Sequence, residues 1–93
     1  MSITPASVPV LPRGVRLHHD RVRDTWVLLA PERAVRLDPV GHAVLSEIDG
    51  KRSFGTIVAA LAAKYDAPED RIAEDSRGLL TGLLNRRMLE LSE

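Results

Sequence analysis

The sequence predicts an α+β domain of the winged helix-turn-helix type, in which a three-stranded antiparallel sheet is followed by three helices. Three observations support this prediction. Short runs of alternating apolar and polar residues occupy 14–37, amphipathic segments with helix-start signals occupy 39 to about 88, and the short loop DGKRS joins the first two of these segments. This order of elements is typical of winged-helix modules.

The chain is large enough for a single small domain with an aliphatic core. It has 93 residues, of which 44% are hydrophobic but only three are aromatic. Residues 1–12 contain Pro5, Pro9 and Pro12 without any apolar period, which predicts a flexible Pro-rich tail or linker. We expect residues 13–93 to form the folded domain.

Three segments have the patterns of β-strands. Residues 14–20 alternate as a half-buried strand does, whereas residues 25–30 are apolar on both faces and suit a central strand. Residues 34–37 form a short third strand on an edge of the sheet, ended by the helix-start pair Asp38-Pro39. Between the second and third strands, PE at 31–32 fits the centre of a type I turn.

Three helices are expected after the strands. The first follows Asp38 and stops before Asp49-Gly50, where glycine can adopt a left-handed conformation. The second is capped by Ser53, and the third begins near Pro68 and runs to about residue 88. The third helix has an apolar face that is too wide for one contact, because leucines at 79 and 83 fall on one side of it and leucines at 80 and 84 on the other.

Charge and composition limit the classes of function. Thirteen basic and thirteen acidic residues cancel, so the chain lacks the positive field that gathers nucleic acid or anionic lipid. The chain has no cysteine, and its N-terminus resembles neither a signal peptide nor a membrane span. We therefore expect a cytoplasmic protein that binds neither nucleic acid nor membrane.

The residues that could carry catalysis have simpler explanations. His18 and His19 are neighbours on a strand and point to opposite faces, so they do not chelate one metal together. Glu74 and Asp75 lie about 100° apart on a helix and do not face each other across a substrate. We expect no enzyme activity, no catalytic residues and no metal.

Peptide recognition is the class of function that remains. The strand at 34–37 has an open edge, and its short length and outward Arg36 are equally consistent with simple protection of that edge. The wide apolar face of the third helix favours the other interpretation, in which an extended peptide adds as a fourth strand between this edge and the helix.

Several motifs resemble the PqqD family, which are peptide chaperones of pyrroloquinoline quinone (PQQ) biosynthesis and belong to the RiPP recognition elements. The resemblance covers about residues 14–91 and rests on the run WVLLAPE at 26–32, on Leu37-Asp38, on Ile48-Asp49-Gly50, and on a stripe formed by Ile57, Leu61, Ala62 and Tyr65. It implies a non-catalytic winged-helix domain without a cofactor. It also implies two partners, the ribosomal precursor peptide PqqA and the radical SAM enzyme PqqE, to which the peptide is delivered.

The resemblance also implies a binding site. In this family the peptide lies along the third strand and against the third helix. Carried over to this chain, the pairing strand consists of Ala34, Val35, Arg36 and Leu37, and helical phase gives the helix wall as Ile72, Asp75, Ser76, Leu79 and Leu83.

Two further possibilities stay open at the level of sequence. Some relatives are fused behind PqqC, and a linker from such a PqqC fusion would look like the Pro-rich segment 2–12. A winged-helix DNA-binding domain or a general protein-interaction module is the alternative function, because one fold serves many functions. The acidic residues of the third helix count against DNA.

Overall fold

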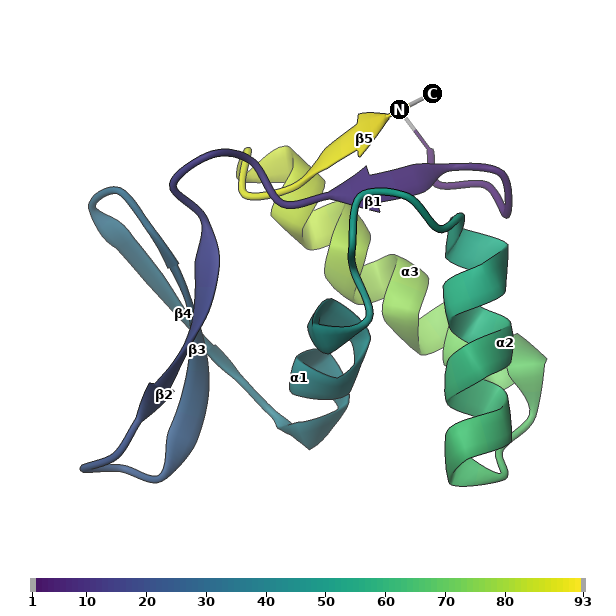
Figure 1. Cartoon of the computed structure of the whole chain (residues 1–93), viewed down its shortest axis with the longest axis horizontal. Helices are drawn as coiled ribbons and strands as arrows, with labels where there is room; N and C mark the ends of the chain where they lie inside the picture. The colour runs from purple at the N-terminus through teal and green to yellow at the C-terminus, as the bar shows by residue number, and fades with distance from the viewer. Residues whose placement is uncertain (1, 93) are drawn as a thin grey trace.

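The computed structural model describes residues 2–92, which form two small antiparallel sheets and three helices (Figure 1). One sheet contains β2, β3 and β4, and the other joins β1 near the N-terminus to β5 near the C-terminus. In chain order, the elements are β1 (Val8–Val10), β2 (Arg16–Asp20), β3 (Thr25–Ala30), β4 (Arg33–Leu37), α1 (Pro39–Ser46), α2 (Phe54–Tyr65), α3 (Glu69–Asn85) and β5 (Glu90–Ser92).

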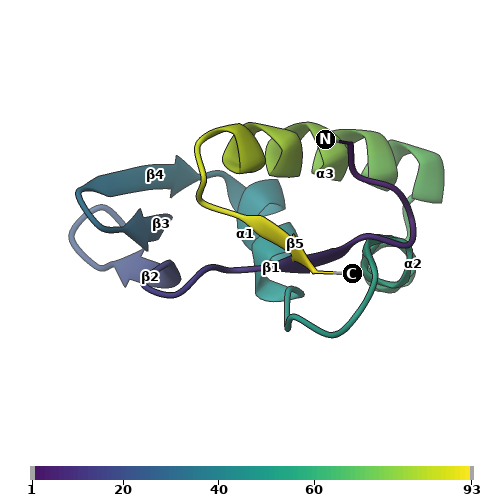
Figure 2. The same ribbon diagram turned by 90° about the horizontal axis from the view of Figure 1, so that it is seen from above.

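The three-stranded sheet confirms the order expected from the sequence. Its strands run β2-β3-β4, so β3 is central and β4 is an edge strand. Leu28 on β3 is fully buried and lies between Leu17 of β2 and Val35 of β4. Side chains alternate between the two faces of a strand, so these residues define the inner face of the sheet. The sheet extends away from the helices at one end of the molecule (Figures 1 and 2).

The turn between β3 and β4 differs from the expected type I turn. Glu32 has a φ of 63°, which belongs to the left-handed region. A positive φ at the second central position, after a proline at the first, is the signature of a type II turn. Pro31 fixes a negative φ at the first central position, which excludes the type I′ and II′ turns that two-residue hairpins favour. Glycine would adopt the conformation of Glu32 with less strain than glutamate.

The helices begin where the sequence predicts, and α3 ends earlier than expected. The Asp38 carboxylate accepts a hydrogen bond from Gly41 N at 2.6 Å, and the Ser53 hydroxyl accepts one from Thr56 N at 3.2 Å. α3 ends at Asn85 because Arg87 takes a φ of 60°. The amides of Arg87 and Met88 then bond back to the carbonyls of Leu84 and Leu83 in a Schellman motif.

The N-terminal segment is folded, so the expectation of a flexible tail at 1–12 is wrong for residues 2–12. Val8–Val10 pair with Glu90–Ser92, and Ile3 is only 4% exposed within the core. The carbonyls of Ser7 and Pro5 accept hydrogen bonds from Phe54 N and Gly55 N, which are among the unpaired amides at the start of α2. Met1, the first residue of the expected tail, and Glu93, the last residue of the expected domain, lie outside the described residues.

The core lies between the sheet and the helices and continues beneath the two terminal strands. α2 packs against α3, and α1 contacts both helices and β4. Met88 and Leu89, which follow α3, are buried and extend the core toward β5. Within residues 2–92, no helix has the length and apolar character needed to cross a membrane.

We predict that Ile3→Ala destabilises the protein by about 2–4 kcal/mol, because it removes a buried side chain and leaves a cavity. Urea denaturation followed by circular dichroism measures the change. Val22→Ala is the matched control, since Val22 is 95% exposed and its truncation removes no packing. Equal stabilities of the two variants would show that the N-terminal segment does not contribute to the core.

We predict that Glu32→Gly raises the free energy of unfolding by about 0.5–1 kcal/mol, because glycine takes the left-handed conformation without steric cost. Glu32→Ala keeps the Cβ atom and should bring no such gain. Thermal denaturation of both variants tests the turn assignment, and a gain in the alanine variant alone would refute it.

Candidate functional site

The outer edge of β4 is open. Within residues 2–92, β3 is the only strand that pairs with β4. The two-residue turn makes Ala30 and Arg33 a hydrogen-bonded pair, so the bonding direction alternates from there along β4. The backbone N–H and C=O groups of Ala34 and Arg36 therefore point away from β3. These four groups can hydrogen-bond an additional strand.

A groove lies between α1 and α3, next to the end of β4. Its first part is a hollow of about 250 Å³ lined by Asp38, Val40, Gly41, Asp75 and Leu79. Its second part is a pocket of about 200 Å³, which extends between α1, α2 and α3. Val40 and Asp75 line both parts, so the two form one continuous depression, which we call the α1–α3 groove.

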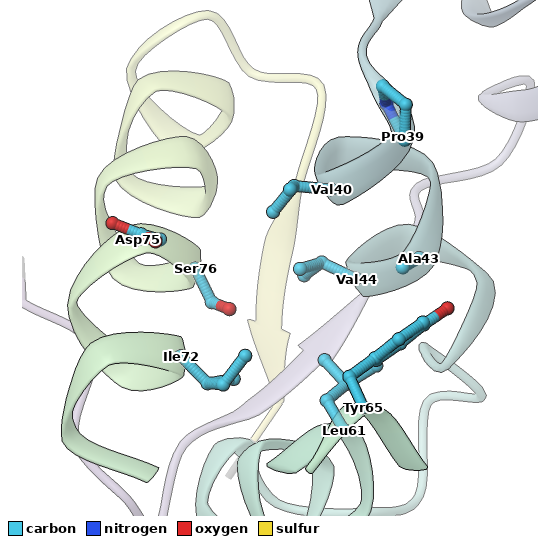
Figure 3. Close-up of a pocket in the computed structure, with 9 residues that line it drawn as sticks. All are labelled: Pro39, Val40, Ala43, Val44, Leu61, Tyr65, Ile72, Asp75 and Ser76. Carbon is cyan, nitrogen blue, oxygen red and sulfur yellow. The ribbon is translucent and has the colours of Figure 1, made fainter. Parts of the chain in front are cut away.

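The pocket at the inner end of the α1–α3 groove is mostly apolar (Figure 3). Side chains from three helices point into it, with Val40 and Val44 on one side and Ile72 on the other. Tyr65 borders the pocket with its hydroxyl directed away from Ser76. A cavity of this size holds a group about as large as one ring, so it suits a single apolar side chain.

Ser76 is the one buried polar side chain among the described residues, and its hydroxyl faces the pocket. The residue is 1% exposed, and its Oγ has no hydrogen-bond partner in the structure. Figure 3 shows this oxygen directed toward the space between α3 and α1. An unpaired buried hydroxyl costs free energy, so a ligand with a donor or acceptor at this depth would recover part of that cost.

Arg33 connects the start of β4 to the end of α3. Its Nη1 donates a hydrogen bond of 2.9 Å to the Arg86 carbonyl, which lies beyond the last turn of the helix. A cation near a helix C-terminus also interacts favourably with the helix dipole. This contact fixes the distance between β4 and α3 at the end that lies away from α1.

The structure brings most of the expected site residues together. Ala34, Val35, Arg36 and Leu37 lie on β4, although Leu37 is buried under the sheet. Ile72, Asp75 and Ser76 line the pocket, and Leu79 lines the hollow beside it. The expectation that Leu83 belongs to the helix wall is corrected. Leu83 is 2% exposed, because its side of α3 turns into the core, and it does not line the groove.

Sequence reasoning missed the contribution of α1 and α2 to this site. Val40 and Tyr65 lie at helical spacing with the apolar residues of α1 and α2, but they are 54% and 53% exposed. Both sit at a helix end, Val40 in the first turn of α1 and Tyr65 in the last turn of α2. Their positions at helix ends could have indicated this exposure, because the apolar residues at the ends of a helix often lie outside the core.

Two of the three histidines pack against Trp26. The ring of His42 stacks on Trp26 with centroids 4.1 Å apart, and His19 lies against the same indole at 5.0 Å. His18 is exposed on the opposite face of the sheet. Among residues 2–92, no three His, Cys, Asp or Glu side chains gather in a way that could hold a metal ion.

Comparison with known proteins identifies the family. The family model described as "Coenzyme PQQ synthesis protein D (PqqD)" matches residues 25–89, which is most of the chain. The chain belongs to the PqqD family. This result confirms the resemblance seen in the sequence motifs.

Characterised relatives of the PqqD family cover nearly the whole chain. A PqqA binding protein of Rhizobium meliloti is 49% identical over 89 residues, covering 96% of this chain and 91% of the relative. The solution structure of the PqqD part of PqqCD from Methylobacterium extorquens, a functional and stand-alone RiPP recognition element, is 44% identical. It matches with a TM-score of 0.84 and covers 96% of this chain and 95% of that chain.

A second solved structure in this comparison contains a peptide. TbiB1 in complex with the TbiA(β) leader peptide is 28% identical to this PqqD-family chain, with a TM-score of 0.71. The match covers 86% of this chain and 93% of TbiB1. The fold of this chain is therefore shared with a protein that binds a leader peptide.

We predict that Ser76→Ala leaves the fold intact and raises the free energy of unfolding by as much as about 1 kcal/mol, because it removes an unpaired buried hydroxyl. Ser46→Ala is the control, since the Ser46 hydroxyl donates a 2.7 Å hydrogen bond to the His42 carbonyl. That variant should be slightly destabilised. Urea denaturation of both proteins measures the difference, and a marked loss of stability in Ser76→Ala would mean that the hydroxyl has a partner in solution.

Proposed function

We propose that this chain is a non-catalytic peptide chaperone of PQQ biosynthesis, which binds the precursor peptide PqqA by strand addition to the open edge of β4. The observation that carries the proposal is the position of that edge. The outward N–H and C=O groups of Ala34 and Arg36 lie just before the junction of β4 with α1, and residues of this junction line the α1–α3 groove.

The groove supports binding of an extended peptide with one apolar anchor. A peptide paired with β4 and running toward Asp38 would reach the hollow first and the apolar pocket next. Main-chain hydrogen bonds would provide affinity without regard to sequence, and the pocket would select the anchor side chain. The Ser76 hydroxyl adds one polar contact at the bottom of this pocket.

Energetics favour reversible binding. The four outward backbone groups would contribute about 0.5–1.5 kcal/mol each, and one buried apolar anchor would add about 1.5–3 kcal/mol. Flanking contacts along the groove would add to this total, against an association and ordering cost of several kcal/mol. The remainder is small compared with the binding free energy of tight complexes, so binding should be reversible, as expected of a chaperone that must release its cargo.

The comparisons support the identity of the peptide and the role in the pathway. The relative from Rhizobium meliloti is described as a PqqA binding protein, and the solved PqqD structure from Methylobacterium extorquens as a recognition element. In the proposed role, the domain works in the cytoplasm and presents bound PqqA to the radical SAM enzyme PqqE. The chain supplies recognition, and the chemistry belongs to the enzyme.

The proposal is tested by titrating the ¹⁵N-labelled protein with synthetic PqqA. We expect amide shifts concentrated in residues 33–40 and 72–79, along the edge of β4 and the α1–α3 groove. Shifts confined to β1 and β5 would exclude the site. Binding of random duplex DNA at moderate salt, without any response to PqqA, would favour the alternative DNA-binding function.

We predict that Ala34→Pro weakens PqqA binding about tenfold, because proline removes an outward amide and places a ring on the edge. The hydrogen bonds to β3 should survive, since the Ala34 amide does not take part in them. Ala34→Gly is the matched control: it keeps the amide and, because Ala34 is exposed, loses little packing. Isothermal titration calorimetry measures both affinities, and equal binding by the folded proline and glycine variants would refute strand addition at this edge.

A further inference from the structure

The outer face of the β2-β3-β4 sheet is a second exposed surface, distinct from the α1–α3 groove. Cross-strand register places Val27 between His18 and Arg36, and Leu29 between Arg16 and Ala34. These side chains lie opposite Leu28 and the other inward residues, and no helix covers them (Figures 1 and 2). The face is slightly hollow and is also lined by Arg23 from the turn after β2.

This outer sheet face is positively charged. Arg16, Arg23 and Arg36 are exposed, and none of them forms an ion pair with another residue in the described part of the chain. Asp20 is the one carboxylate among the residues that line the face; it accepts hydrogen bonds from the amides of Val22 and Arg23 and keeps its negative charge, so three arginines stand against one carboxylate. The uncompensated charge is therefore concentrated on a surface of a protein whose net charge is zero.

Apolar groups are interleaved with these arginines. Val27 and Leu29 are half-buried at the centre of the face, and Val22 at the tip of the β2–β3 turn is 95% exposed. Arginines around a small apolar centre are a composition that protein interfaces favour. A duplex nucleic acid fits less well, because the face itself carries the carboxylate of Asp20 and the chain as a whole has no net positive charge.

The outer sheet face adjoins the proposed peptide site through β4. Val35 and Leu37 point inward, whereas Ala34 and Arg36 point to the outer face. A peptide added to β4 would alternate in the same way, so every second side chain would extend the outer sheet face. A protein docked on this face would therefore touch both the chaperone and one side of the peptide.

We propose that the outer sheet face docks an acidic surface of the enzyme that modifies the bound peptide. This inference rests on the proposed function and extends it to the partner. Charge complementarity accelerates the encounter and selects the partner, while Val27 and Leu29 provide apolar contact. The partner is then recruited on the face where the outward side chains of the peptide are displayed.

The test uses purified PqqE and measures its affinity for the chaperone with and without saturating PqqA. The variant Arg16→Gln with Arg23→Gln removes two charges from β2 and its turn, away from the peptide edge. The matched control, Lys51→Gln with Arg87→Gln, removes two exposed charges outside this face. We expect about tenfold weaker PqqE binding for the first pair, unchanged binding for the control, and a smaller salt dependence in the first pair than in the wild type.

Each result has a defined meaning. Equal PqqE binding by the two double variants, or equal loss in both, would overturn the docking surface. Salt-sensitive binding of random duplex DNA that is lost in Arg16→Gln with Arg23→Gln, or a change in self-association of that variant by sedimentation, would also overturn it. The affinity for PqqA is measured in parallel: failure of the wild type to bind PqqA refutes the proposed function, whereas intact PqqA binding with unaffected PqqE binding refutes the docking surface alone.

Discussion

The one-residue junction between β4 and α1 is the constraint on which the site depends. Leu37 is the last residue of the strand and Pro39 the first of the helix, so Asp38 alone must turn the chain. Its carboxylate caps α1 through Gly41 N, and the proline ring suits the first helical position. This short connection holds the first turn of α1 against the end of the edge strand. Val40 is consequently exposed beside Asp75 of α3, and the groove opens where the strand ends.

α3 serves the core and the groove with different parts of one wide apolar face. Leu80 and Leu83 are fully buried, whereas Ile72 and Leu79 are half-buried along the groove. Ser76 lies between these two groups and carries the only polar side chain that is buried within residues 2–92. A larger apolar side chain at this position would occupy part of the pocket. The serine therefore keeps the space open at a small cost in stability.

Local signals in the sequence were sufficient for the strands, the helix starts and the open edge. Alternation marks β2 to β4, and Asp38 and Ser53 cap helices by contacts within three residues. Most of the errors involve contacts that are distant in sequence. The Pro-rich segment has no period of its own, and it becomes a strand because its partner lies at Glu90–Ser92. The left-handed Glu32 follows from how β3 and β4 pair, and the burial of Leu83 depends on how α3 is rotated against the core.

The pairing of β1 with β5 joins the two ends of the described chain, with Val8 opposite Ser92. The same N-terminal segment supplies the carbonyls that satisfy the first amides of α2, so one short stretch connects the start, the middle and the end of the polypeptide. Strand β5 and the start of α2 are therefore both held by hydrogen bonds to the same N-terminal segment. Loss of that stretch would remove Ile3 from the core and leave the α2 amides without partners at the same time. Because this segment links distant parts of the chain, the domain should unfold as a single cooperative unit.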